Sequence, residues 1–420
     1  MRILMLAHRI PYPPHTGDKT RAFHILRLLR ARHEVTLGFL IDDAADRQGV
    51  AALRELVPDL EFRRVWKPLS LLKGLGGLAT GGALSVSYFH SRGLRRRLVR
   101  RSHERPYDLV YAYSGPMAQY GRGLGIPLVM DFVDVDSDKW RQYADHSRPP
   151  LSWLYRTEAR RLQASEAEIA SWASLCLLAT PVEETLLRSF APWARTAVIP
   201  NGIDSEYYAP SGIDPSQPAV IFTGAMDYLP NSDAVRHFCA DILPLVRREI
   251  PETAFYIVGL NPSPDVVRLG EISGVTVTGA VPDVRPYYAR AGVCVAPMRI
   301  GRGIQNKVLQ GMAMSLPVVA SSLAGRGIQA EAGRDLEIAD DPAVFAAHVV
   351  RLLRSRAERR RLGEGGRACV ETHYVWERNV ERLEPLLAAA AGRGTRSPGA
   401  KRATSGLARV GGGREPRSQP

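Results

Sequence analysis

The sequence has few of the features that anchor a chain in a membrane or cross-link it. Its four cysteines are scattered with no CxxC pair, which argues against a zinc site or a disulfide framework: Cys176, Cys239, Cys294 and Cys369. No stretch approaches the ~20 apolar residues of a membrane-spanning helix. The opening MRILMLAHRIP breaks at proline and lacks a signal-peptide cleavage site, so we expect a buried first strand. These absences favour a cytoplasmic protein with at most peripheral contact with the inner face of the cytoplasmic membrane.

Acidic residues are fewer than basic ones: the sequence has 43 Asp and Glu and 56 Lys and Arg, which gives a formal net charge of +13. Residues 392–420 hold seven Lys and Arg against Glu415 alone, and their Gly, Ser and Pro content predicts a disordered basic tail. A second basic block, residues 92–105, follows the apolar stretch LSLLKGLGGLATGGALSV. That stretch and block could rest on an anionic membrane, or the block could be a solvated helix face. Nucleic acid is not expected as a partner, because no recognition-helix motif is present.

Apolar strand-like runs alternate with helical patterns from the start of the chain, which is typical of parallel βαβ units. The expected strands are ILMLA, EVTLGFLI, DLVYAY and PLVMDFVDV, with a helical pattern in KTRAFHILRLLRARH between the first two. Near Val198 the segment VIPNGIDSEYYAPSGIDPSQP is rich in turn residues and indicates a domain junction. We expect residues 1–205 to form an N-terminal Rossmann-like domain.

The same alternation restarts after the junction, with AVIFTGAM, TAFYIVG, VTVTGAV and VCVAPM as the strands of a second parallel sheet. We expect residues 206–374 to form a C-terminal Rossmann-like domain. The helical pattern of residues 375–391 should cross back to the first domain, with Trp376 in the core. The predicted fold class is α/β, with two doubly wound parallel-sheet domains facing each other across a cleft. Ligands of such sheets bind beside the carboxyl ends of the strands.

One loop at these carboxyl ends is PYPPHTGDK, which follows the first strand. Gly17 permits close approach of the backbone, and Asp18 or Thr16 can cap a helix whose free amides would face the cleft. A phosphate group could bind there. A plain capped turn explains the same residues.

A second loop, GRGIQNKVLQ, follows the strand VCVAPM of the second domain. Gly301 and Gly303 allow a tight turn, and Asn306 can cap the helix that follows. The amino end of that helix would direct its amides and its dipole at an anion. Arg302 and Lys307 add full positive charges to this loop.

Together these segments resemble the retaining glycosyltransferases of family 4, whose GT-B fold consists of two facing Rossmann-like domains. The resemblance covers residues 1–391 and rests on VIPNGID, FTGAMDYLPNSDAV and VTGAVPDVRPYYARAGVCVAPMRIGRGIQNKVLQGMA. Within the family, the sequence is most similar to the sugar transferases associated with bacterial exopolysaccharide and PEP-CTERM sorting systems. The resemblance implies a nucleotide-diphosphate sugar held mainly by the second domain and a saccharide or lipid-linked acceptor held mainly by the first.

The sequence departs from this family where the donor binds. Family members usually carry two glutamates eight residues apart, and Arg302 and Gln310 occupy those positions here. Gln310 can still accept a hydrogen bond from a ribose hydroxyl, whereas Arg302 would more naturally engage the diphosphate. The basic residues that the family places after the first strand of the second domain are missing from TGAMDYLPN. We therefore expect Arg302 and Lys307 to neutralise the leaving diphosphate as catalytic residues.

A group of aspartates lies at the carboxyl end of a strand in the first domain: Asp131, Asp134, Asp136 and Asp138. We expect Asp131 and Asp134, together with His8 after the first strand, to bind acceptor hydroxyls. Capping of the loop is the alternative. The DVD sequence also suggests a metal ion, but GT-B enzymes generally work without one, so neither a metal nor a cofactor is expected.

The other expected donor-binding residues are loop positions implied by the resemblance: Gly17, Gly224, Gly303, Ile304 and Asn306, beside Gln310. The expected activity is that of a hexosyltransferase that retains anomeric configuration, in exopolysaccharide or cell-surface glycan synthesis. The missing glutamates leave open a catalytically silent protein that binds a sugar nucleotide or polysaccharide as an assembly partner. A nucleotide-sugar epimerase is a third possibility, disfavoured because the sequence shows no acid/base pair.

Overall fold

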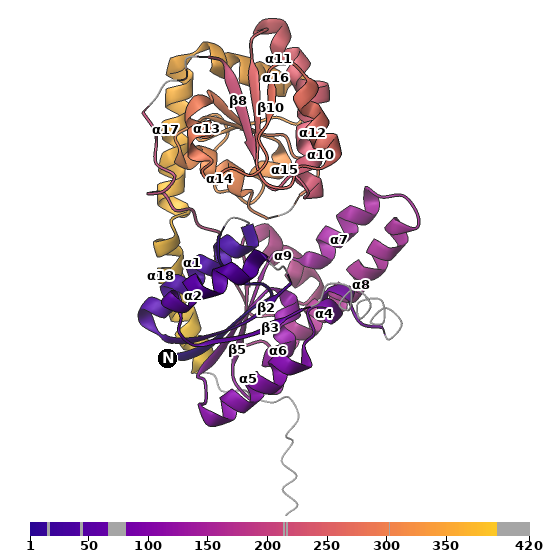
Figure 1. Cartoon of the computed structure of the whole chain (residues 1–420), viewed down its shortest axis with the longest axis vertical. Coiled ribbons are helices and arrows are strands. Elements are labelled where there is room, and N and C mark those ends of the chain that lie inside the picture. The colour runs from indigo at the N-terminus through magenta and orange to yellow at the C-terminus, as the bar shows by residue number, and fades with distance from the viewer. Residues whose placement is uncertain are drawn as a thin grey trace, which may run out of the picture.

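The chain folds into two domains, each built on a parallel sheet covered by helices (Figure 1). The expected α/β class with two facing Rossmann-like domains is confirmed. Arg302, Thr16, the basic tail from residue 393 onward and most of the apolar stretch before the basic block lie outside the described residues. The computed structural model describes residues 1–14, 17–42, 45–65, 81–212, 215, 217–301 and 303–392.

The first domain has a seven-stranded sheet in the order β3-β2-β1-β4-β5-β6-β7, with all neighbours parallel. The strand order reverses between β1 and β4, where doubly wound sheets bind ligands. The strands are β1 (Arg2–Ala7), β2 (Glu34–Ile41), β3 (Leu60–Arg64), β4 (Leu109–Tyr113), β5 (Leu128–Val133), β6 (Leu175–Leu178) and β7 (Thr196–Val198). The α-helices are α1 (Gly17–Arg32), α2 (Gly49–Leu56), α4 (Leu84–Tyr88), α5 (Arg92–Glu104), α6 (Ala118–Gly121), α7 (Asp136–Asp145), α8 (Leu151–Trp172) and α9 (Pro181–Phe190).

The second domain has a six-stranded sheet in the order β10-β9-β8-β11-β12-β13, again with parallel neighbours and with its reversal between β8 and β11. The strands are β8 (Ala219–Thr223), β9 (Ala254–Val258), β10 (Val275–Val277), β11 (Val293–Ala296), β12 (Val318–Ala320) and β13 (Glu337–Ile338). The α-helices are α10 (Leu229–His237), α11 (Leu243–Glu249), α12 (Pro264–Arg268), α13 (Arg285–Arg290), α14 (Asn306–Ala313), α15 (Ser322–Gly325), α16 (Pro342–Arg354) and α17 (Arg356–His373).

The hydrophobic core of the first domain lies on both faces of its sheet. Successive side chains of a strand point to opposite faces, and accordingly Ile3 and Met5 pack in one buried cluster while Leu4 and Leu6 pack in another. A strand buried on both faces reads as a continuous apolar run, which is why ILMLA was recognisable in the sequence. Among the described helices, none is long and apolar enough to span a membrane.

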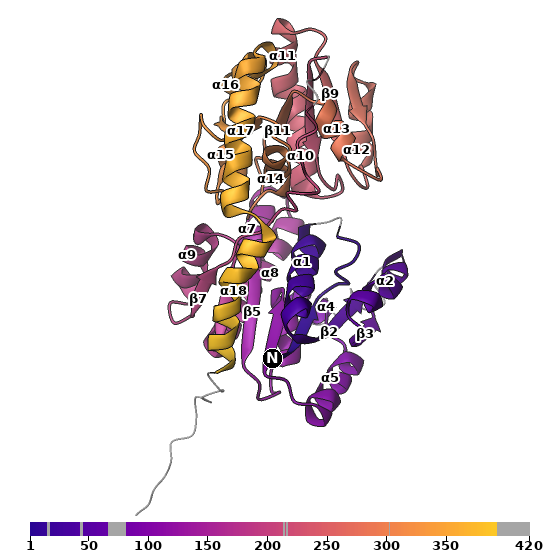
Figure 2. The ribbon, with the colours of Figure 1, turned by 90° about the vertical axis from the view of Figure 1, so that its left-hand side faces the viewer.

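The last helix, α18 (Trp376–Ala391), returns from the second domain and runs along the first (Figure 2). Trp376 is buried in the core of the first domain, which confirms the expectation from the sequence. Its indole stacks on His24 of α1 at 4.9 Å between ring centroids. A Cβ atom at Gly202 would overlap the same indole, so the junction segment passes directly over it. The two connections between the domains are thus packed against each other.

A buried ion pair joins three separate parts of the first domain. Arg21 of α1 donates from Nε and Nη2 to the Asp131 carboxylate at 3.0 and 3.1 Å, and Tyr111 donates its hydroxyl to Asp131 at 2.6 Å. The Nη1 group of Arg21 donates to the backbone oxygen of Ile199 and to Oδ1 of Asn201 in the junction. Arg21 is 1% and Asp131 0% exposed. The carboxylate of Asp131 therefore has no surface left for an acceptor hydroxyl, and its surroundings correct the expected binding role to a structural one.

Removing one partner of this pair should be far more damaging than removing an exposed arginine of the same helix. Arg21→Met leaves a buried, uncompensated carboxylate and should lower the free energy of unfolding by about 3–5 kcal/mol. Combining it with Asp131→Asn removes the charge and should restore part of that loss. The matched control, Arg27→Met, breaks only the exposed contact with Glu377 and should cost less than about 1 kcal/mol. Urea unfolding measures all three, and equal losses for Arg21→Met and Arg27→Met would contradict the assignment.

Candidate functional site

The two domains meet where α1 and α14 begin. A Cβ atom on Gly17, the first residue of α1, would lie 3.2 Å from Nδ2 of Asn306, the first residue of α14. Figure 1 shows α14 at the edge of its domain that faces α1. The loop after β1 and the loop after β11 therefore come together, as the sequence predicted for ligand-binding loops. Each lies at the strand-order reversal of its own sheet.

The tightest approach joins Gly303 to Asp134 of the first domain. Gly303 has a φ of +63°, a conformation that favours glycine. A Cβ atom there would also overlap the Asp134 carboxylate. A glycine is therefore required at this position both by its own backbone and by the neighbouring domain.

Asp134 is held in an unusual state for an aspartate. Its Oδ1 atom is buried and has no hydrogen-bond partner within the part of the chain that the structure describes. Burial, reinforced by the carboxylates of Glu183 and Asp136, raises its pKa to about 7. A half-protonated carboxyl at neutral pH, placed against the loop of the other domain, can exchange a hydrogen bond with a hydroxyl group.

The other acidic residues near Asp134 are committed to the protein itself. Glu183 accepts a hydrogen bond from the backbone N–H of Val135 at 2.8 Å, and Asp136 pairs with Lys139 at 3.2 Å. Asp138 pairs with Arg141. Across the described residues, no group of three or more His, Cys, Asp or Glu side chains is arranged to hold a metal ion. Of the aspartates singled out in the sequence, Asp134 is the one whose carboxylate a Cβ atom on Gly303 of the second domain would overlap.

Lys307 lies in the first turn of α14, with its side chain folded inward. Its Nζ atom donates to Oε1 of Gln305 at 3.1 Å and lies 5.1 Å from the centre of the Phe222 ring. Burial lowers its pKa to about 8, because desolvation disfavours the ammonium form. The helix begins at Asn306, so Gln305 and not Asn306 occupies the N-cap, and among the described residues no side chain caps this helix end. Its amino end accordingly keeps backbone N–H groups without a side-chain acceptor.

Gln310 is tied into a hydrogen-bond network beneath this helix. Its Oε1 atom accepts from Tyr288 at 3.1 Å and from Thr223 at 3.3 Å, and its Nε2 atom donates to the Tyr208 hydroxyl at 3.0 Å. A ribose hydroxyl would have to share or displace these partners. Tyr208 lies in the junction and was missed by sequence reasoning, because a tyrosine in a turn-rich segment gives no periodic signal.

Two other expected donor-binding residues contribute through backbone and packing. Gly224 follows β8, and a Cβ atom there would lie 2.6 Å from Nδ2 of Asn231. A Cβ atom on Gly259, after β9, would in turn overlap the backbone of Gly224. Ile304 is 6% exposed and belongs to the core of the second domain, so its side chain supports the loop from below.

His8 lies at the end of β1, on the first-domain side of the meeting point. Its ring stacks on Tyr113 and meets Phe89 edge-on, and Nε2 lies 3.4 Å from Oδ2 of Asp18. Asp18 lies inside the first turn of α1, since the helix already begins at Gly17. These contacts fix the orientation of the imidazole beside the amino end of α1.

A second bridge between the domains was not expected from the sequence. Tyr143 of α7 lies near Tyr228, in the loop after β8, and burial together with this neighbour raises the pKa of Tyr143. Lys139 lies one helical turn from Tyr143, pairs with Asp136 and lies near Tyr228. The first domain therefore supplies a cation near the loop TGAMDYLPN, which has none of its own.

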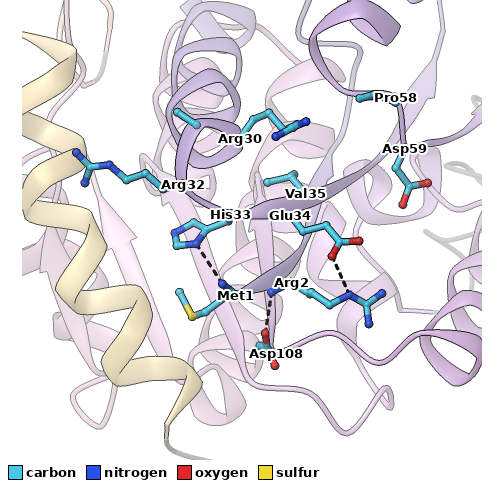
Figure 3. A pocket seen from close by; sticks show the side chains of 11 residues that line it. Met1, Arg2, Arg30, Arg32, His33, Glu34, Val35, Pro58, Asp59 and Asp108 are labelled. Carbon is cyan, nitrogen blue, oxygen red and sulfur yellow. Dashed lines mark hydrogen bonds and ion pairs between the residues drawn. The ribbon is translucent and has the colours of Figure 1, made fainter.

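A pocket of about 780 Å³ lies elsewhere, at the amino ends of β1 and β2 (Figure 3). The amino group of Met1 lies 3.4 Å from Nδ1 of His33, and the backbone N–H of Arg2 donates to Asp108 at 2.7 Å. Parallel doubly wound sheets bind ligands at the opposite, carboxyl edge. Size alone therefore does not make this pocket part of the candidate site.

Comparison with known proteins agrees with this geometry. The model of the glycosyl transferase 4-like domain matches residues 16–202, and that of glycosyl transferases group 1 matches residues 217–355. None of the curated proteins compared with the chain matches it.

Several solved structures share the whole two-domain arrangement. Sucrose-phosphate synthase from Thermosynechococcus elongatus superposes with a TM-score of 0.70 at 18% identity, over 92% of this chain and 98% of that one. HepE from Anabaena, solved in complex with UDP, superposes with a TM-score of 0.66 at 17% identity, over 93% of this chain and 100% of HepE. TarM from S. aureus superposes with a TM-score of 0.67 at 10% identity, over 92% of this chain and 99% of TarM. Each domain matches a glycosyltransferase family model and the two-domain fold is shared with these structures, findings that support a glycosyltransferase of the GT-B fold.

Proposed function

We propose that this protein transfers a hexose from a nucleotide-diphosphate sugar to a saccharide or lipid-linked acceptor, with retention of anomeric configuration, in exopolysaccharide or cell-surface glycan synthesis. The observation that carries the proposal is the meeting of Gly303 and Asn306 of the second domain with Asp134 and Gly17 of the first. The four cysteines are free and buried, which supports a reducing compartment such as the cytoplasm.

The donor would bind along the loop after β11 and the amino end of α14. HepE from Anabaena was solved with UDP and with UDP-glucose, and TarM from S. aureus was solved with UDP. These relatives favour a uridine diphosphate sugar as the first donor to test. The backbone amides at the amino end of α14 suit a diphosphate, since the amino end of a helix attracts anions.

In the proposed reaction the bond between the anomeric carbon and the diphosphate oxygen breaks, and the diphosphate leaves with the electron pair. The acceptor oxygen forms the new bond to the anomeric carbon, and its proton passes to the leaving phosphate. Lys307 and the α14 amides stabilise the charge that develops on the diphosphate, with Arg302 proposed for the same role. Asp134 and His8 would orient the acceptor hydroxyl.

A catalytically silent binding protein is the second candidate, and one observation favours it. Both polar atoms of the Gln310 amide are engaged by Tyr208, Thr223 and Tyr288. Such a network can stabilise the domain without contributing to transfer. Binding and turnover must therefore be measured separately.

A thermal-shift screen should first identify the nucleotide. One of UDP, GDP, ADP, TDP and CMP should raise the melting temperature, because a ligand at 100 times its dissociation constant adds ~2.7 kcal/mol to the stability of the folded state. Inorganic pyrophosphate serves as the control for a charge effect. The corresponding nucleotide sugar should then yield a glycosylated product whose anomeric configuration is read by NMR. A shift without product favours the silent protein, and no shift with any nucleotide contradicts a donor site.

The pH dependence of kcat/KM should be bell-shaped, with limbs near 7 and 8. Asp134, whose raised pKa is about 7, becomes ionised above that pH, whereas Lys307, whose lowered pKa is about 8, loses its positive charge above that pH. Asp134→Asn should remove the acidic limb. Lys307→Arg should keep its charge and move the alkaline limb to higher pH. An alkaline limb that stays in place in folded Lys307→Arg would remove Lys307 from the mechanism.

Gly303→Ala should block transfer by holding the domains apart. The new methyl group would overlap Asp134, and misplacement of reacting groups by about 1 Å can cost ~100-fold in rate. The matched control is Gly125→Ala, which has a similar φ of +70° but nothing within 4 Å of the added atom. Both variants should lose about 1 kcal/mol of stability from backbone strain, so equal transfer rates would contradict the proposed closed site.

A further inference from the structure

Helices α7 and α8 form a helical arm that projects from the first domain (Figure 1). The two helices pack mainly on each other, through a cluster of aromatic rings. Trp140 lies 5.3 Å from Tyr155 and 5.9 Å from Tyr143 between ring centroids. These rings hold the distal part of the arm together, whereas the last turns of α8, with Ile169 and Ala170, pack in the buried cluster on the sheet.

The end of the arm exposes large apolar side chains that this internal packing leaves uncovered. Leu151 is 51% exposed and Trp153 is 67% exposed, the largest exposed fraction among the large hydrophobic residues of the described chain. Arg156 and Arg160 are exposed too, and they follow Trp153 by three and seven residues, which places all three on one stripe of α8. Arg148, in the connection between the helices, is also exposed.

Tryptophan and arginine on one exposed stripe suit the surface of an anionic bilayer. The indole ring prefers the boundary between water and hydrocarbon, and each arginine near the surface is attracted by acidic lipid headgroups. Arg156 is only loosely paired, 3.9 Å from Asp145, so its charge remains accessible.

The basic helix α5 is a weaker candidate for the same surface. Arg97 and Arg101 of α5 turn inward to pair with Glu61 of β3. The leucines of that helix, Leu94 and Leu98, are fully buried, so α5 presents no large apolar side chain to a bilayer. Exposed charge without an apolar anchor gives only electrostatic attraction.

We propose that the tip of the α7–α8 arm docks on an anionic membrane surface through Trp153, Leu151, Arg156 and Arg160. Docking does not require transfer activity. Its consequence for the acceptor rests on the proposed function: α7 begins two residues after Asp134 and its length of ~15 Å separates that carboxyl from the docked tip. A lipid-linked acceptor, anchored in the same bilayer, is therefore the acceptor class that docking favours over the free saccharide.

Sedimentation of the purified full chain with lipid vesicles tests this inference. The wild type should bind vesicles of phosphatidylcholine mixed with phosphatidylglycerol, and bind phosphatidylcholine alone weakly. Trp153→Ser combined with Leu151→Ser should weaken binding to the mixed vesicles by about tenfold or more, since two apolar side chains no longer leave water. Arg156→Gln combined with Arg160→Gln should weaken it ~30-fold, because two charges near the surface are lost.

Matched controls separate the arm from other surfaces. Trp193→Ser removes another exposed tryptophan, 58% exposed in the turn after α9, and Arg95→Gln with Arg96→Gln removes two outward charges of α5; both should bind as the wild type does. Wild-type binding by the arm variants, or no binding of the wild type, would overturn the inference. Arm variants that bind vesicles as the wild type does, but are no longer retained on an insoluble polysaccharide, would identify polysaccharide as the ligand of the arm and would also overturn the inference. Transfer to a water-soluble acceptor should persist in the arm variants, so loss of docking and failure of the proposed activity are distinguishable.

Discussion

The buried ion pair between Arg21 and Asp131 is the contact on which the first half of the site depends. It fixes α1 against β5 in a place that water does not reach, and it also reaches the junction through Asn201. Gly17 lies one turn before Arg21, and Asp134 lies three residues after Asp131. Two of the groups that meet the second domain are thus positioned by one arginine. A buried pair of this kind need not add stability over an apolar pair, but it accepts few alternative geometries.

The site combines two ionisable groups whose burial moves their pKa values toward each other. Burial raises the pKa of Asp134 and lowers that of Lys307, because each loses the water that stabilises its charged form. Burial of either charged group costs free energy of folding, and the packing of the surrounding sheets must offset this cost. A protein that keeps such groups beside an interdomain contact retains chemistry at the expense of stability, which is typical of functional sites.

Sequence reasoning found the architecture because the evidence for it is local. Apolar runs such as ILMLA indicate strands buried on both faces, and the glycines of the loop after β11 can be read directly from the sequence. Sequence reasoning failed where the role of a residue depends on a contact with a residue far away in the sequence. Arg21 reads as one more polar position in a helix, and Asp131 reads as the end of a strand, yet the pairing of these two residues across 110 positions decides the role of each. The prediction that Asn306 caps α14 is wrong by one residue, since the N-cap is Gln305. Helix boundaries depend on backbone geometry that the sequence does not show.

Close contact between the domains is possible because side chains are missing where they touch. Added Cβ atoms at Gly17, Gly303 and Gly327 would come into contact with or overlap Asn306, Asp134 and Thr180 of the opposite domain. Gly17, Gly303 and Asn306 belong to loops at the two strand-order reversals, whereas Asp134 and Thr180 follow the neighbouring strands β5 and β6. Asp134 is buried at this contact, and its burial, reinforced by the carboxylates of Glu183 and Asp136, raises its pKa. The glycine at position 303 therefore lets the second domain approach the Asp134 carboxyl more closely than any residue with a side chain would allow.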